Sequence, residues 1–309
     1  AAAAVMIVVL DCIMTFFGST ANDAAFNAWI TDTVPNERRG KAESVLAILP
    51  LISMLVIFGL FDAMTQRGEW QKFFAIFGGL VVLTGLVSVF LIPEPKLAPR
   101  KEPYLKTLIY GLRPSVVKEN PALYLAFAAF CLFSVAVQVF FPYLIIYMQN
   151  YLQFDGYALV LGIVLIFASV VSVLSGRVID RLGQLRCVLP AATVMFVGLV
   201  GMFFARAMAA VIAAGCVMMS GYMLITAILS GVIRDETPAG KAGQFQGIRM
   251  LFGVLLPMIL GPAIGAAVIR GGDSTYIDLG VVKTVPTPSI FLAAAVVLLL
   301  MAPAGRLRR

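Results

Sequence analysis

The sequence predicts an all-α membrane protein with nine transmembrane helices, and three observations support this fold class. Hydrophobic residues make up 61% of the 309 residues, charged residues only 13%, and the mean hydropathy is +0.98. A soluble domain has roughly 45–50% apolar and about 25% charged residues. Apolar runs of about 20 residues, the length that spans a bilayer, alternate here with short charged segments. Helices satisfy the backbone inside lipid, and the alternating pattern of a membrane barrel is not seen.

The apolar spans and one long polar connection define the domain organisation. The expected helices cover residues 3–33, 42–62, 71–92, 122–150, 157–179, 187–205, 208–233, 243–270 and 288–305. Residues 94–120 contain four prolines and six basic residues, and residues 104–112 fit a short amphipathic helix at the membrane interface. We therefore expect a partial N-terminal bundle of three helices (1–93), a cytoplasmic linker (94–120) and a six-helix C-terminal bundle (121–309).

The positions of the basic residues predict the orientation of the chain. If the segment after the first span is cytoplasmic, cytoplasmic segments hold 17 of the 23 Lys and Arg residues and outer segments hold 5. Cytoplasmic loops of membrane proteins are enriched in these residues. We expect a monomeric multi-pass protein of a bacterial-type inner membrane with a cytoplasmic C-terminus. The net charge of +7 then reflects this topology and not a nucleic-acid partner.

Several chemistries are disfavoured by composition. The chain has no histidine, and its four cysteines lie singly in or beside apolar spans, so neither a metal site nor a disulfide framework is expected. No paired-aspartate or nucleotide-binding loop motif occurs. We therefore expect no cofactor, no metal and no enzymatic activity.

An internal repeat links the two ends of the chain. Residues 30–35 and 233–238 both read I-x-D-x-x-P, at an offset of 203 residues. At the same offset Asp23 corresponds to Thr226 and Asn27 to Ser230, so a pair of polar residues four apart recurs on one helix face. Parallel repeats of this kind are known in transporters.

Three loop sequences resemble one known family. Residues 176–186 contain G-x-x-x-D-R-x-G, residues 32–40 read D-x-x-P-x-E-R-R-G, and residues 235–241 form a related loop. In order and spacing these resemble the loops of the major facilitator superfamily of secondary transporters. The resemblance implies that the chain corresponds to helices four to twelve, with the first three missing. It also implies transport of a small solute by alternating access.

The same loops contain the expected gating residues. The carboxylate of Asp180 is expected to cap the start of the second span, near residues 40–43, or to pair with a basic residue when the cytoplasmic side is closed. The gating set is Gly176, Asp180, Arg181, Gly183, Arg186, Asp32, Arg38, Arg39, Arg234 and Asp235.

Polar and aromatic residues inside the spans are the candidates for solute or ion binding, because polar groups in hydrocarbon are costly and usually face a cavity or a partner. An acid in the first span could bind a coupling proton or cation, or could hydrogen-bond a neighbouring helix. An arginine in the eighth span could snorkel, pair with an acid or bind an anion. The candidates are Asp23, Asn27, Gln138, Phe141, Tyr222, Thr226, Ser230 and Arg249.

Within the transporter class, two functions remain open. We expect ion-coupled symport of a nutrient, with a carbohydrate as one candidate, because amides, hydroxyls and aromatic faces suit a polar organic solute. The G-P-x-x-G-G element that antiporters of this family carry in helix five does not occur in residues 42–62, although residues 261–265 read G-P-x-x-G. Efflux of drugs or metabolites by antiport is the alternative. A membrane scaffold or receptor with this fold is the non-transport alternative.

Overall fold

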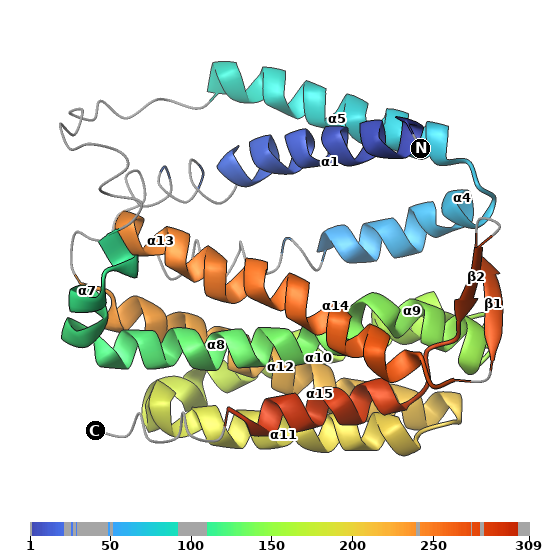
Figure 1. Ribbon diagram of the computed structural model, residues 1–309. Coiled ribbons are helices and arrows are strands. Elements are labelled where there is room, and N and C mark those ends of the chain that lie inside the picture. Colours follow the sequence, from blue (N-terminus) through green and yellow to red (C-terminus); the bar gives the residue numbers. More distant parts are fainter. Residues whose placement is uncertain are drawn as a thin grey trace. The chain divides into compact units, whose positions relative to one another are not determined.

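The computed structural model describes residues 2–21, 26, 29, 49, 52–91, 110–238, 242–272, 274–278 and 281–301. The chain forms two compact units, Ala1–Arg100 and Lys101–Arg309 (Figure 1). Each unit is described by itself below.

Unit 1 contains apolar helices, and a tight turn joins the last two of them. Its elements are α1 (Ala2–Ser19), a helical segment from residue 52 that contains the π-helical η2 (Ile57–Phe61) and α4 (Asp62–Gln66), and α5 (Trp70–Leu91). The turn before α5 uses Gly68 at φ 70°, a conformation that glycine adopts without strain. Lys72 Nζ lies 2.9 Å from Glu69 Oε2 and donates a hydrogen bond to it. This hydrogen bond and the positive charge of Lys72 lower the pKa of the Glu69 carboxyl.

Unit 2 contains the remaining long helices. In chain order they are η3 (Tyr110–Leu112), α7 (Pro114–Glu119), α8 (Pro121–Phe140), η4 (Phe141–Tyr143), α9 (Leu144–Ile146), η5 (Tyr147–Tyr151), α10 (Tyr157–Leu182), α11 (Gln184–Phe204), α12 (Met208–Glu236), α13 (Ala242–Met250), η6 (Leu251–Leu255), α14 (Leu256–Ile269) and α15 (Ser289–Leu299). A hairpin of β1 (Thr275–Asp278) and β2 (Val281–Thr284) separates α14 from α15, with Thr275 paired to Thr284. The sequence analysis did not predict this hairpin or α7.

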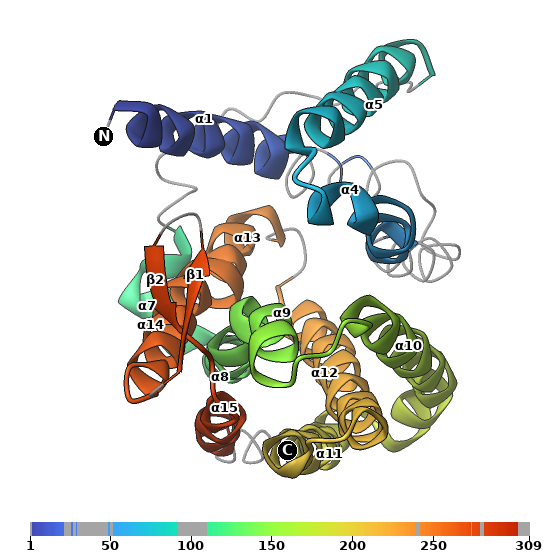
Figure 2. The ribbon, with the colours of Figure 1, turned by 90° about the vertical axis from the view of Figure 1, so that its right-hand side faces the viewer.

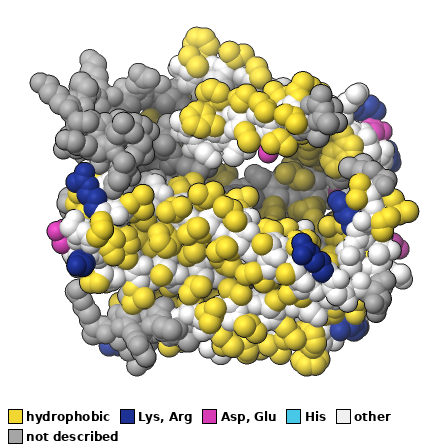
Figure 3. Space-filling view, in the orientation of Figure 1, with side chains coloured by type: hydrophobic (Ala, Val, Ile, Leu, Met, Phe, Trp, Pro, Cys, Tyr) yellow, Lys and Arg dark blue, Asp and Glu magenta, His cyan; other side chains and the backbone are white. Residues whose placement is uncertain are grey.

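The all-α membrane fold class is confirmed. Among the described residues, six helices are long and apolar enough to cross a membrane, and three shorter apolar helices lie at residues 5–19, 52–66 and 289–299. Each of the nine falls largely within an expected span, but the exact count of nine transmembrane helices stays a prediction. In unit 2, hydrophobic side chains cover most of the middle of the visible face, and Lys and Arg lie nearer its two ends (Figure 3).

Helix α12 lies in the middle of unit 2. It packs against α8, α10 and α11, whereas α15 packs against α8, α11 and α14 (Figure 2). The approach of α11 to α12 is close because Gly198 faces the backbone of Met218 and Gly221 faces the backbone of Met195. Small residues allow this approach in membrane proteins, where hydrophobicity does not drive helices together. Among the described residues, the largest fully buried side chains all lie in unit 2.

Two of the long segments of unit 2 are interrupted close to a proline, although α11 and α14 remain helical through Pro190 and Pro262. Proline has no N–H to donate to the carbonyl four residues earlier, and its ring clashes with that carbonyl. Pro142 lies in the 3₁₀ turn η4, which separates α8 from α9. Pro257 opens α14, and the carbonyl four residues before it belongs to Gly253, inside the π-helical segment η6. Each of these two segments therefore has a break in its regular α-helical hydrogen bonding within the apolar region, which is called its joint below.

The segment expected as a loop between the fifth and sixth spans is much shorter than predicted. Helix α10 continues to Leu182 and α11 begins at Gln184, so the chain reverses at the single residue Gly183. Gly183 has φ 86° and ψ 137°, and glycine is the residue that adopts such a backbone without strain. The expected spans 157–179 and 187–205 therefore each gain one turn or less of helix.

Candidate functional site

Part of the candidate set lies outside the described residues. This holds for Asp23, Asn27, Asp32, Arg38 and Arg39, and for the side chains of Asp180 and Arg181. The internal repeat at an offset of 203 residues, the part of the expected helix over residues 3–33 that follows residue 21, and the contact of the 176–186 segment with the second span therefore remain predictions. The site below is built from unit 2 alone.

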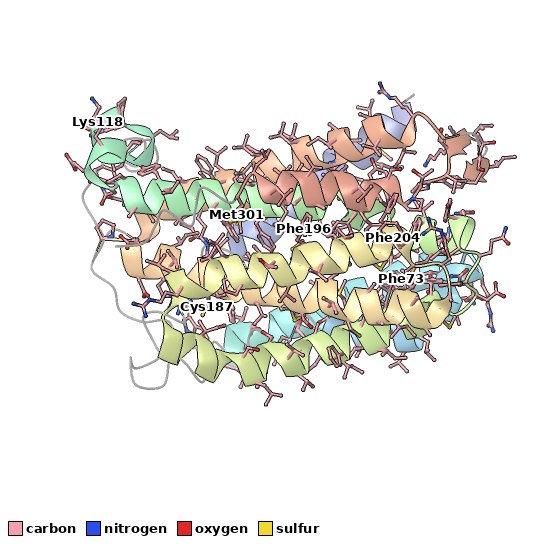
Figure 4. The ribbon with its side chains drawn as sticks, turned by 90° about the horizontal axis from the view of Figure 1, so that it is seen from below. Phe73, Lys118, Cys187, Phe196, Phe204 and Met301 are labelled. Carbon is pink, nitrogen blue, oxygen red and sulfur yellow. The ribbon has the colours of Figure 1, made fainter. Side chains whose placement is uncertain are left out.

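The two ends of the unit 2 bundle are named here by residues visible in Figure 4. Lys118 on α7 and Cys187 near the start of α11 lie at one end, called the Lys118 end, and Phe204 at the close of α11 lies toward the other, the Phe204 end (Figure 4). Helix α12 runs toward the Lys118 end, because α11 runs away from it and the two are consecutive.

Helix α12 presents a row of candidate residues. Tyr222, Thr226 and Ser230 are spaced by four, so they lie on one face, and each side chain is partly buried. The distance along the helix from Tyr222 to Ser230 is about 12 Å, since each residue rises about 1.5 Å. The Thr226 hydroxyl donates a hydrogen bond of 2.8 Å to the carbonyl oxygen of Tyr222, on its own helix. The middle of the row is therefore less polar than its sequence suggests.

The end of the row at Tyr222 is supported by aromatic side chains of α8. The rings of Phe133 and Tyr222 are stacked, with centroids 5.6 Å apart and planes at 29°. Phe133 is fully buried and also contacts Phe130, whose ring fills the space beside Gly253 in η6. Tyr222 is thus held by a continuous aromatic layer between α12 and η6. The sequence analysis did not select Phe130 or Phe133, although their spacing of three residues on α8 places them on one face.

At the other end of the row, Ser230 meets a permanent cation. Arg249 Nη2 on α13 lies 3.5 Å from Ser230 Oγ on α12, and both side chains are partly buried. These two residues are 19 positions apart and were selected independently from the sequence. The structure therefore brings one pair of the predicted residues together across two helices.

The candidates on α8 have a different environment. Gln138 packs against Gly261 on α14. A Cβ atom added at Gly261 would meet the Gln138 side chain and would lie 2.8 Å from the main-chain carbonyl carbon of Gln138. Phe141, in the 3₁₀ turn, is 41% exposed. The neighbouring Tyr143, which sequence reasoning missed, donates a hydrogen bond of 3.0 Å to the carbonyl oxygen of Pro262. This G-P-x-x-G segment of the eighth span thus packs against α8.

The gating candidates in unit 2 lie at the Lys118 end. Gly176 is inside α10 with no atom near its Cβ position, Arg186 is exposed in the first turn of α11, and Arg234 and Asp235 are exposed in the last turn of α12. One further contact joins the α10–α11 junction to α12. The side-chain amide of Gln184 lies over Gly231, where a Cβ atom would be 2.6 Å from Gln184 Oε1. Gly231 directly follows Ser230, so the junction packs against the same turn of α12 but on a different face.

Metal chemistry finds no support in the described part of the chain, where no three His, Cys, Asp or Glu residues cluster as metal ligands would. The described arrangement can offer a solute a cation, hydroxyl groups and aromatic surface.

Comparison with known proteins identifies the family. The sequence matches the Major Facilitator Superfamily over residues 2–262. It is also similar to the multidrug transporter QDR2 of Candida glabrata, with 28% identity over 188 residues, which covers 57% of this chain. The chain spans 31% of the length of that relative. The resemblance seen in the loop motifs is thus confirmed, and the chain belongs to the Major Facilitator Superfamily of membrane transporters.

Proposed function

We propose that this protein is a secondary active transporter that exports amphiphilic organic solutes, and that the solute contacts the α12 row. The observation that carries the proposal is the composition of the row. Tyr222 supported by Phe133 offers aromatic surface at one end, and Ser230 beside Arg249 offers polar contacts at the other. Small-molecule sites combine mainly apolar and aromatic surface with a few placed polar groups, as this row does.

Efflux is preferred to carbohydrate symport on chemical grounds. A sugar requires many hydrogen-bonding groups directed at it, because unpaired hydroxyls are costly away from water. The Thr226 hydroxyl donates to its own helix, as does that of Ser220 at 2.6 Å, so neither hydroxyl can donate to a solute in the described conformation. Similarity to a multidrug transporter is compatible with export. Nutrient symport, the first expectation from the sequence, stays the alternative.

The coupling ion and orientation complete the proposal. We retain a proton or cation as the coupling ion, with Asp23 and Asn27 as its candidate site. We also retain a cytoplasmic Lys118 end and C-terminus in a bacterial-type inner membrane, because the sequence assigns most Lys and Arg to cytoplasmic segments.

Proteoliposomes would test this function. The protein, expressed from its complete reading frame, would be reconstituted with an acidic exterior and a pH-sensitive dye inside. Export by antiport predicts that internal aromatic amphiphiles are lost as protons enter. Accumulation of a sugar together with protons would instead establish symport.

Tyr222→Leu should raise KM for the amphiphile, whereas Tyr222→Phe should leave it nearly unchanged. If proton flux follows no solute in a panel of drugs, organic acids and sugars, the transport proposal fails.

A further inference from the structure

We propose that the η3–α7 segment, residues 110–119, binds anionic phospholipids at the membrane surface. Arg113 and Lys118 contact the lipid phosphates, and Leu112 and Val117 lie at the boundary between the headgroups and the acyl chains. This inference concerns the lipid around the transporter and is independent of the solute. Its basis is the position of the segment, the way it is held and the composition of its exposed side.

Helix α7 lies at the Lys118 end of the unit 2 bundle, beside the start of a helix long enough to cross the membrane (Figure 4). Only Asn120 separates α7 from Pro121, where that apolar helix begins. Asn120 has a non-helical backbone, with φ −127° and ψ 57°, and its side-chain amide donates a 3.0 Å hydrogen bond to the carbonyl oxygen of Val116. The chain therefore bends at Asn120, and α7 is a separate helix at the edge of the apolar region.

One side of the segment is held by the bundle. Val116 is 3% exposed, and Gly111 is buried. The Tyr124 hydroxyl on α8 donates a hydrogen bond to the carbonyl oxygen of Gly111. The Tyr110 ring meets the ring of Phe245 on α13 edge to face, with centroids 6.1 Å apart. The segment is therefore fixed against α8 and α13, and this attachment determines which of its side chains are exposed.

The exposed side combines positive charge with apolar surface. Arg113 and Lys118 are exposed, as are Leu112 and Val117. Successive helical residues are turned by about 100°, so the direction midway between Val117 and Lys118 is about 150° from that of Glu119. The nearby acid therefore points away from this side. Among the described residues, neither Arg113 nor Lys118 forms an ion pair.

This composition is complementary to an anionic lipid surface. Apolar side chains of an interfacial helix enter the boundary between headgroups and acyl chains, while Lys and Arg attract anionic lipids. The Arg113 guanidinium lies 5.9 Å from the centroid of the Tyr110 ring, and its planar fork of N–H donors suits a phosphate. Lys118 adds a second positive charge. A free phosphate ion would leave Leu112 and Val117 in water, whereas a bilayer covers them, so we assign the site to phospholipids.

A photo-crosslink on this side of α7 tests the inference. The protein, expressed from its complete reading frame with p-benzoylphenylalanine in place of Val117, would be irradiated in nanodiscs of equal parts phosphatidylglycerol and phosphatidylcholine. Mass spectrometry would give the ratio of the two crosslinked lipids. We expect phosphatidylglycerol to be enriched at least about fivefold, since each basic residue near an anionic surface contributes roughly that factor. Arg113→Gln combined with Lys118→Gln should bring the ratio close to one.

Two single substitutions separate this side of α7 from the net charge of the protein. Arg206→Gln removes an exposed cation at the Phe204 end, and Glu119→Gln removes an exposed acid from the other side of α7. At physiological ionic strength each should change the lipid ratio less than about twofold, because distant exposed charges are screened. A ratio near one with both cations present, or an enrichment that survives their removal, would overturn the inference. Crosslinking mainly to the protein itself would also overturn it, because another part of the chain would then cover this surface.

A further measurement keeps both cations, so it remains valid if the doubly substituted protein does not fold. Raising the ionic strength from 0.1 M to 1 M shortens the Debye length from about 10 Å to about 3 Å. The enrichment of phosphatidylglycerol should therefore fall toward one at high salt. An enrichment that salt does not change would contradict recognition by charge. Transport plays no part in these readouts, so their outcome is separate from that of the export proposal.

Discussion

Two helix pairs in unit 2 use glycine in different ways. Between α11 and α12 the glycines face main chain, since Gly198 meets Met218 and Gly221 meets Met195 in an antiparallel arrangement. Between α8 and the η6–α14 segment, which run in parallel, Gly253 faces only the Phe130 ring, whereas Gly261 and Gly265 also lie close to main-chain atoms of Gln138 and Val139. A side chain can rotate, but a helix backbone can yield only by moving the whole helix. The contacts of Gly198 and Gly221 are therefore more rigid than the contact of Gly253 with Phe130.

The difference extends to the helices themselves. Helices α11 and α12 are each continuous, whereas α8 is followed by a 3₁₀ turn at Pro142 and α14 is preceded by a π-helical segment. Unit 2 thus combines a continuous α11–α12 pair, which carries the row at Tyr222, Thr226 and Ser230, with a jointed pair, α8 and η6–α14, which supports the row through Phe130 and Phe133.

The largest expected effect tests the rigid pair. Gly221→Ala would place a Cβ atom within 2.5 Å of Met195 Cα, so α11 and α12 must separate. We expect a loss of about 1–3 kcal/mol or more in stability, measured as a lower Tm in nanodiscs. Gly247→Ala is the matched control, because no atom lies within 4 Å of its Cβ position in α13. That substitution should be neutral or stabilising by up to about 1 kcal/mol. A Tm for Gly221→Ala equal to that of the control would contradict the assignment of rigidity.

A smaller and different effect is expected in the jointed pair. Gly253→Ala would bring a Cβ atom to 2.5 Å from Phe130 Cε1, a ring atom that can move. The stability loss should be on the order of 1 kcal/mol, below that of Gly221→Ala. Because Phe130 contacts Phe133, which supports Tyr222, the affinity for an exported aromatic amphiphile should also fall. A destabilisation as large as that of Gly221→Ala, with unchanged affinity, would remove the distinction between the two pairs.

The smallest expected effect concerns a single hydrogen bond of the jointed pair. Tyr143→Phe removes the hydroxyl that donates to Pro262 across α8 and α14. Interhelical hydrogen bonds in membranes average about 0.6 kcal/mol, so the loss in Tm should be barely above that of Tyr151→Phe, a partly exposed control. A loss as large as that of Gly253→Ala would mean that this hydrogen bond, and not ring packing, holds the two helices together.

Helix positions were predictable from the sequence because the bilayer requires long apolar segments. The expected spans 71–92 and 122–150 compare with α5 at Trp70–Leu91 and with a helical segment at Pro121–Tyr151. Pro142 and Pro257 mark the joints, but Pro190 and Pro262 lie inside continuous helices, so proline alone would not have located the joints. The sequence indicates the hairpin at residues 275–284 more weakly, through β-branched residues on either side of Leu279–Gly280.

The contacts of the site were not predictable in the same way. Helical spacing placed Tyr222, Thr226 and Ser230 on one face, but it does not fix how α12 is rotated against its neighbours. The pairing of Ser230 with Arg249 and the stacking of Tyr222 on Phe133 depend on that rotation. They also depend on glycine contacts between helices that are distant in sequence. A single sequence does not show which residues of two such helices lie opposite one another.

The one-residue reversal at Gly183 has a consequence for natural variation in this protein. Because α10 ends at Leu182 and α11 begins at Gln184, the junction consists of Gly183 alone. The φ of 86° at Gly183 disfavours every residue except glycine. Insertions, deletions and non-glycine codons should therefore be rare at this position among orthologous genes. The β1–β2 hairpin, with Ile277 75% and Val282 66% exposed, should tolerate changes of length and sequence far more readily. Those strands are thus the natural place to introduce an epitope into this protein.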